Sequence, residues 1–219
     1  MIKRIALIAA ALLPLPARAQ SADATLDRAV AVYSRMSSIR AEFNQTLTNP
    51  LTGTTASTSG TLLRRKPNLL SISFTNGDHI VADGSTLWLY VPSSVPGQVI
   101  RQSSRGAATT AFDPAREFLS APHSRYTASA GGKATAGGRA AHLVTLSPKS
   151  ASAPFAQVKL WVDDTDNSVR QFEVTDRNGL TRSITITHLT INPVLPRSAF
   201  SFTPPKGVRV VTQPLQQLN

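Results

Sequence analysis

The segment spanning residues 60–91 constrains the fold more than any other part of the chain, because it contains four strand patterns in close succession. Within it, Leu70, Ile72 and Phe74 alternate with polar side chains. This two-residue period is typical of a strand that has one face against apolar material. Pro67 disfavours a helix here and suits the beginning of a strand. The segment therefore predicts a sheet with at least one apolar face.

The last strand of this segment carries large side chains on both faces. Asp83-Gly84 precedes it and predicts a two-residue hairpin turn, because both central positions of that turn need a positive φ. After the turn, Leu87 and Leu89 point to one face of the strand, while Trp88 and Tyr90 point to the other. Such a sheet must be covered by other elements or bind an apolar ligand.

The first nineteen residues have the features of a secretory signal peptide. Lys3 and Arg4 precede an apolar run over residues 5–13, and Ala17-Arg18-Ala19 offers small residues for cleavage. The run is too short to span a bilayer, which takes about 20 apolar residues. We therefore expect residues 1–19 to be removed and residues 20–219 to form a single domain in the periplasm. The chain contains no cysteine, which excludes disulfides and a lipid anchor on cysteine.

The chain is strongly basic, and the charge narrows the choice of partners. The net charge of +11 falls to +8 when Lys3, Arg4 and Arg18 leave with the signal peptide. A positive exterior favours anionic lipid headgroups, acidic protein patches or nucleic acid. Export argues against nucleic acid.

A mature chain of about 200 residues suits a mainly β domain. Residues 22–36 predict a helix with an apolar stripe of Leu26, Val30 and Tyr33. Residues 41–47 and 54–63 predict the first hairpin. Turn signals then recur about every ten residues, which is typical of an antiparallel meander or barrel. The expected later strands are 99–101, 126–130, 141–146, 157–162, 169–176 and 180–189, with a loop over 93–110 and a glycine-rich hairpin over 131–138.

A second, short helix is predicted after residue 112. Asp113 suits the N-cap, Pro114 the first helical position, and Pro122 ends the helix. A helix of two turns is unstable alone, so it must bury Phe118 and Leu119 against the sheet. We expect it to act as a lid.

No pattern of catalytic or metal-binding residues is evident. The histidines at 79, 123, 142 and 188 lie in separate elements, so none forms a local metal-ligand pair. The acidic stretch 163–166 lacks the glycine and closing glutamate of a calcium loop and predicts a hairpin turn. No serine lies in a nucleophile elbow. We therefore expect no cofactor and no metal, and we disfavour an enzyme, although a hydrolase with a dispersed site stays open.

Arg64-Arg65-Lys66 is the one sharp charged feature. Three interpretations remain open from the residues alone. The triplet is a solubilising strand edge, a docking patch for an acidic partner, or a latch that donates to carbonyls on the lid around residues 113–121.

The apolar residues of the sheet also have two interpretations. Core packing is the ordinary role of such residues. Two helices offer few large side chains to fill both faces of about ten strands, which favours a cavity. The candidate cavity residues are Leu70, Ile72, Phe74, Trp88, Leu89, Phe118 and Leu119.

Motifs along nearly the whole mature chain resemble the family of periplasmic outer-membrane lipoprotein carriers, LolA. They occur in the family's order and are AEFNQ at 41–45, KPNL at 66–69, DG at 83–84 with LWLY at 87–90, LSPK at 146–149, TR at 181–182 and FSFTPPKGV at 200–208.

The resemblance implies an unclosed antiparallel β-barrel with short helices as a lid over its concave apolar face. It implies a hydrophobic cavity that takes the acyl chains of lipoproteins, and no chemistry on the cargo. The partners implied are lipoproteins, an ABC-type release complex in the inner membrane and a receptor in the outer membrane, with the carrier a monomer. An envelope module of the same barrel type that senses lipid or binds a partner is the alternative.

The sequence departs from the family pattern at the proposed latch. The family has arginine immediately before the proline, and Lys66 occupies that position here. Lysine keeps the charge but loses the planar fork of donors. Our hypothesis is that Lys66 latches the lid, while Arg65 faces the other side of the strand.

Overall fold

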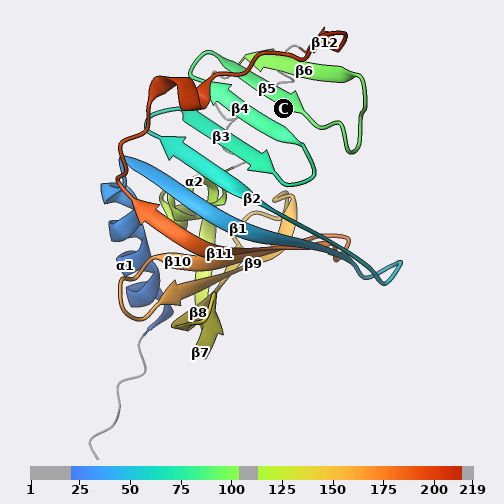
Figure 1. Cartoon of the computed structure of the whole chain (residues 1–219). Coiled ribbons are helices and arrows are strands. Elements are labelled where there is room, and N and C mark those ends of the chain that lie inside the picture. Colours follow the sequence, from blue (N-terminus) through green and yellow to red (C-terminus); the bar gives the residue numbers. More distant parts are fainter. Residues whose placement is uncertain (1–20, 104–112, 214–219) are drawn as a thin grey trace, which may run out of the picture.

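The computed structural model describes residues 21–103 and 113–213, and these form one large sheet with few helices (Figure 1). The sheet has 12 strands in the order β12-β6-β5-β4-β3-β2-β1-β11-β10-β9-β8-β7. Neighbours pair antiparallel except β12, which runs parallel to β6. The two edge strands, β12 and β7, stand at opposite ends of this order, so the sheet is unclosed as expected.

The elements follow the expected succession. The helices are α1 (Ala22–Arg35), α2 (Pro114–Leu119), α3 (Pro122–Arg125) and the 3₁₀ helix η2 (Arg197–Phe200). The strands are β1 (Ser38–Asn49), β2 (Thr54–Arg65), β3 (Leu69–Phe74), β4 (His79–Asp83), β5 (Thr86–Tyr90), β6 (Gln98–Ser103), β7 (Tyr126–Ala136), β8 (Arg139–Pro148), β9 (Phe155–Asp163), β10 (Val169–Asp176), β11 (Thr181–Ile191) and β12 (Arg209–Thr212). The predicted signal peptide and much of the loop at 93–110 lie outside the described residues.

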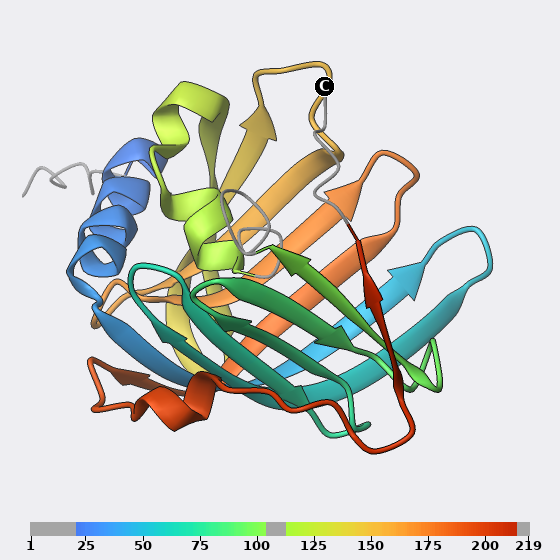
Figure 2. The same cartoon turned by 90° about the horizontal axis from the view of Figure 1, so that it is seen from above.

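Helices α1, α2 and α3 lie on one side of the sheet, and the sheet curls around that side (Figure 2). A buried apolar cluster joins α1 and α2 to strands β7 to β10. Its members include Leu26 and Tyr33 of α1, Phe118 and Leu119 of α2, Leu146 of β8, Leu160 of β9 and Phe172 of β10. We call this set the helix cluster. It confirms that the short helix is held by packing its apolar residues against the sheet.

A second apolar cluster lies on the same face of strands β1 to β5. Its buried members are Phe43, Leu70, Ile72, Ile80, Ala82 and Leu87, with Phe74 and Leu89 packed against them. We call this set the strand cluster. Ile184 and Ile186 of β11 pack against the strand and helix clusters respectively, so apolar side chains cross the whole concave face.

The opposite, convex face of β2 to β5 is covered by the C-terminal segment that contains η2. Leu195 and Phe200 bury Leu69 there, with Leu63 packed beside them. Figure 2 shows this segment on the side of the sheet away from the helices. The sequence argument that helices alone must cover both faces overlooked it.

Three details differ from the sequence-based expectation. Strand β7 runs through the predicted glycine-rich hairpin, because Gly131 and Gly132 form a bulge and the turn is made by Gly137-Gly138. Pro122 begins the short helix α3 as well as ending α2. Strand β12 was not expected. Of the described helices, none is long and apolar enough to cross a membrane.

Candidate functional site

The structure divides the predicted apolar site residues between the two clusters of the concave face. Leu70, Ile72, Phe74 and Leu89 belong to the strand cluster. Phe118 and Leu119 belong to the helix cluster, where the Phe118 ring packs edge-on against Phe155 at 5.5 Å. Six of the seven predicted residues therefore share one face of the sheet, but they lie in two groups.

Trp88 is the residue that the structure separates from the others. Its ring lies 5.9 Å from that of Phe202 in the segment covering the convex face. Its indole N–H donates to Asp83 at 3.2 Å, and Arg101 lies over the ring. Alternation along β5 places Trp88 and Leu89 on opposite faces of the strand. Trp88 therefore packs under the C-terminal segment and does not line the concave face.

Lys66 contacts α1 and not the lid helix in the described contacts. Its ammonium donates to the carbonyl oxygen of Ser34 at 2.8 Å and lies 3.5 Å from that of Tyr33. These carbonyls belong to the last turn of α1, where a cation suits the helix dipole. Burial and the neighbouring charge of Arg64 lower the pKa of Lys66. The predicted chemistry of a cation on helix carbonyls is present, but on another helix.

Arg65 faces the convex side, as its place in the strand predicts. It donates to the carbonyl oxygen of Leu195 at 2.7 Å, and its guanidinium lies over the ring of Phe200. Arg65 therefore fixes the C-terminal segment to the sheet.

Arg64 is the functional candidate that the sequence argument missed. Its Nη1 donates to the hydroxyl of Tyr33 at 2.8 Å and lies 3.5 Å from Oδ2 of Asp113. The side chains of Arg64 and Asp113 are only 7% and 6% exposed. Asp113 is also the N-cap of α2, since its Oδ1 accepts from the amide of Arg116. One buried ion pair thus ties the sheet to the beginning of the lid helix.

The environment of this ion pair is apolar. It shifts the pKa of the neighbouring Tyr33. Burial raises the pKa of Tyr33, and the charge of Asp113 adds to that rise, while Arg64 opposes it. Arg64 pairs in register with Ile39 of β1 and Leu70 of β3. It therefore stands where the helix cluster and the strand cluster meet. The alternation of β2 could have identified Arg64 as a residue of the concave face, because it places Arg64 on the same face as Leu62.

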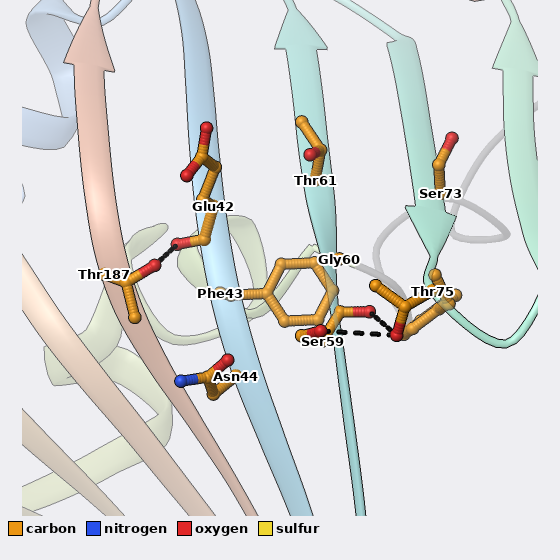
Figure 3. Close-up of a pocket in the computed structure, with 10 residues that line it drawn as sticks. Glu42, Phe43, Asn44, Ser59, Gly60, Thr61, Ser73, Thr75 and Thr187 are labelled. Atoms are coloured by element: carbon orange, nitrogen blue, oxygen red, sulfur yellow. Dashed lines mark hydrogen bonds between the residues drawn. The ribbon is translucent and has the colours of Figure 1, made fainter.

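A pocket of about 370 Å³ lies across β11, β1, β2 and β3 (Figure 3). The polar side chains that line it are Glu42, Asn44, Ser59, Thr61, Ser73, Thr75 and Thr187. Along β1, Glu42 and Asn44 alternate with inward Phe43, so these polar side chains belong to the convex face. Thr187 donates to the carbonyl oxygen of Glu42 at 3.1 Å.

Several other titratable residues form surface pairs or lie in the turn between β9 and β10. His123 contacts Asp27 at 2.7 Å, and His142 contacts Asp164 at 2.5 Å. Within the described residues, no group of three or more metal-ligating side chains occurs. Asp163 is buried in the predicted turn, with Arg139 and Arg170 as partners. Burial raises the pKa of Asp163, but these hydrogen bonds outweigh it and hold the pKa far below its usual range.

Comparison with protein families gives one match that covers most of the chain. Residues 34–203 match the family described as outer membrane lipoprotein carrier protein LolA. An outer-membrane lipoprotein carrier protein of Chromobacterium violaceum is 32% identical over 186 residues, which cover 83% of this chain and 84% of the relative. A protein of the same name from Dechloromonas aromatica is 28% identical over 205 residues, with 92% of each chain covered.

Solved structures agree on the fold. An uncharacterized conserved protein from Thermus thermophilus superimposes with a TM-score of 0.55 at 13% identity. The match covers 89% of this chain and 100% of that protein.

Proposed function

The chain belongs to the LolA family of outer membrane lipoprotein carrier proteins, and we propose that it carries lipoproteins through the periplasm from the inner to the outer membrane. Their acyl chains bind on the concave apolar face. The observation that carries this proposal is the continuity of the helix and strand clusters across that face. The predicted residues Leu70, Ile72, Phe74, Leu89, Phe118 and Leu119 are the proposed acyl contacts.

The energetics of the cargo require such a shield. Each methylene buried from water contributes about 0.8 kcal/mol. An acylated lipoprotein therefore cannot cross the aqueous periplasm with its chains exposed.

Release of the lipoprotein requires that part of the free energy gained by burying its acyl chains be offset. In this structure, α2 buries Phe118 and Leu119 in the helix cluster. Cargo must displace these contacts, so binding is weakened by the cost of opening. The lid thus makes affinity low enough for transfer to an acceptor.

The roles of the two latch candidates follow their contacts. We propose that Lys66 fixes the end of α1, from which β1 continues, and that the pair of Arg64 and Asp113 holds α2 closed. Breaking a buried ion pair is costly, so the beginning of α2 stays on the sheet while cargo displaces Phe118 and Leu119 farther along the helix.

The proposed partners follow from the family. The carrier receives lipoproteins from an ABC-type complex in the inner membrane and delivers them to a receptor in the outer membrane. It acts as a monomer, binds cargo without covalent chemistry and needs no cofactor. A basic exterior suits acidic surfaces on either partner.

Copurification tests this function directly. The tagged protein is isolated from the periplasm of cells in which outer-membrane delivery is blocked, and bound molecules are identified by mass spectrometry. We expect triacylated lipoproteins. Recovery of phospholipid without lipoprotein, or of no lipid, would contradict the proposal.

A further inference from the structure

Arg64 has more hydrogen-bond donors than the described residues 21–103 and 113–213 satisfy. A guanidinium carries five N–H groups, of which two are on Nη1. Nη1 is used by Tyr33 and Asp113. Nε and Nη2 are buried, and neither has a hydrogen-bond acceptor in the described structure. Buried donors without an acceptor are rare in proteins and point to a missing partner.

These donors lie in the middle of the apolar concave face. Arg64 pairs with Leu70 of the strand cluster and hydrogen-bonds Tyr33 of the helix cluster. A ligand whose apolar parts spread over both clusters would therefore bring the group that joins them close to Arg64. The geometry calls for a molecule with several apolar chains and hydrogen-bond acceptors at their junction.

The charge of the site selects the kind of acceptor. Asp113 already compensates Arg64 within the buried pair. A second carboxylate or a phosphate would leave a net negative charge in an apolar environment, which is strongly unfavourable. Neutral carbonyl oxygens accept hydrogen bonds without adding charge, and a planar guanidinium can bind two of them side by side. Ester and amide carbonyls fit this requirement.

We propose that Nε and Nη2 of Arg64 bind the ester and amide carbonyl oxygens at which the acyl chains of the cargo meet. This inference rests on the proposed carrier function and adds a polar anchor to it. Arg64 fixes how deeply the chains enter, so the protein distinguishes an acylated cysteine from a plain hydrocarbon. Asp113 and Tyr33 stay bonded to Nη1 at the beginning of α2, and Nε and Nη2 become accessible to the cargo as Phe118 and Leu119 move away.

The test compares two ligands that differ only in the carbonyl groups. One is a synthetic cysteine lipopeptide with two ester-linked chains and one amide-linked chain. The other carries the same two chains through ether linkages and keeps the amide, so that only the ester carbonyls are missing. N-phenylnaphthylamine, an apolar fluorescent probe without a carbonyl group, measures binding to the apolar surface. Dissociation constants are obtained for the mature wild-type protein and its variants.

The main variant is the double substitution Arg64→Met with Asp113→Asn. It removes both members of the buried pair, so no uncompensated charge remains, and asparagine keeps the N-cap of α2. The single substitution Asp113→Asn serves as a comparison, because it keeps Arg64 and removes only the charge of its partner. Arg65→Met is the matched control, because Arg65 lies one residue away on the convex face.

We expect wild type to bind the ester-linked lipopeptide about tenfold or more tightly than the ether-linked one, as hydrogen bonds to a charged group allow. The double variant should bind both lipopeptides alike, and its affinity for N-phenylnaphthylamine should be no lower than that of wild type, because the lid is held less tightly without the ion pair. Arg65→Met and Asp113→Asn should keep the preference for esters.

Two outcomes would overturn the inference. One is an equal preference for esters in wild type and in the double variant. The other is a parallel loss of affinity for all three ligands in the double variant, which would assign Arg64 a purely structural role. If wild type bound none of the three ligands, the carrier function itself would fail, which is a separate and recognisable result.

Discussion

The ammonium of Lys66 donates to the carbonyl oxygen of Ser34 at 2.8 Å and so binds the residue before Pro67 to the last turn of α1. The lid helix α2 is instead tied to the sheet through Arg64 and Asp113. Arg64 and Lys66, two cations close together at the end of β2, thus hold two different helices.

Lys66→Met should therefore have a small effect on transport. The interaction is partly exposed, and we expect the free energy of unfolding to fall by about 1 kcal/mol or less. Transfer of lipoprotein from membranes to an acceptor should stay near the wild-type rate. Loss of transfer with a normal unfolding curve would instead make Lys66 the latch of the lid.

Phe118→Ala should weaken the closed state. Phe118 is 4% exposed and packs against Tyr126 and Phe155. Truncating a buried phenylalanine costs about 3–5 kcal/mol of stability. Because the lid then opens at lower cost, the variant should bind N-phenylnaphthylamine more tightly and release lipoprotein more slowly.

Phe172→Leu is the matched control for this change. Phe172 belongs to the same helix cluster but lies on β10 of the sheet. It should lower stability without raising the affinity for the probe. Weaker probe binding by Phe118→Ala would contradict this expectation, because it would mean that the contact of Phe118 with the ligand outweighs its part in holding the lid closed.

Two adjacent substitutions in β5 test whether the probe binds on the concave or the convex face. Leu89→Ser removes an apolar contact of the strand cluster, and we expect about tenfold weaker probe binding for a loss of about 1.4 kcal/mol. Trp88→Ser removes a contact with the C-terminal segment on the other face. It should lower the unfolding temperature and leave probe affinity unchanged. The reverse pattern would place the ligand on the convex face.

Gly60→Ala should destabilise the middle of the sheet. A Cβ there would lie 2.5 Å from the carbonyl oxygen of Ser73 and 2.9 Å from the Phe43 ring. The Phe43 ring also packs edge-on against Phe74 at 5.6 Å, so it has little room to move. We expect a loss of about 1–3 kcal/mol in denaturant unfolding. Ser57→Ala, at an exposed position of the same strand, should change stability by less than about 0.5 kcal/mol.

Asp163→Asn should change how stability depends on pH. The pKa of Asp163 is lowered in the native state, so its contribution is present above the unfolded-state pKa of about 4 and is lost as the pH falls below it. Leaving Arg139 and Arg170 without their buried partner should cost about 3 kcal/mol at pH 7. The difference from wild type should shrink as the pH is lowered through 4. Asp164→Asn, at a more exposed position, should show little of this effect, and a pH-independent difference for Asp163→Asn would contradict the assignment.

Much of the fold could be predicted from local patterns. The strict alternation around Ile72 and the cap of Asp113 are consequences of backbone geometry, and each gave the observed element. The hairpin after β4 was also predicted, but its turn is centred on Gly84 and Ser85, and of the predicted pair only Gly84 has a positive φ. Strand β12 could not be predicted in this way, since Arg209–Thr212 is short and is defined only by its parallel pairing with distant β6.

The candidate site was harder to predict, because it depends on which segments cover each face. Alternation placed Trp88 and Leu89 on opposite faces of the strand, but it did not show that Leu195 to Phe202 cover the face that carries Trp88. The charged triplet drew attention to Lys66, which precedes the proline. Alternation alone places Arg64 on the concave face, but its partners Tyr33 and Asp113 are distant in the sequence.

Site-specific photocrosslinking in living cells tests the central claim most directly, namely that lipoproteins ride on the concave apolar face. A photoreactive benzoyl-phenylalanine replaces either Phe74 of the strand cluster or Trp88 of the convex face, and adducts are detected with antibodies against an outer-membrane lipoprotein. We predict adducts from position 74 and none from position 88. Adducts from position 88 alone, or from neither position in a folded and exported protein, would contradict it.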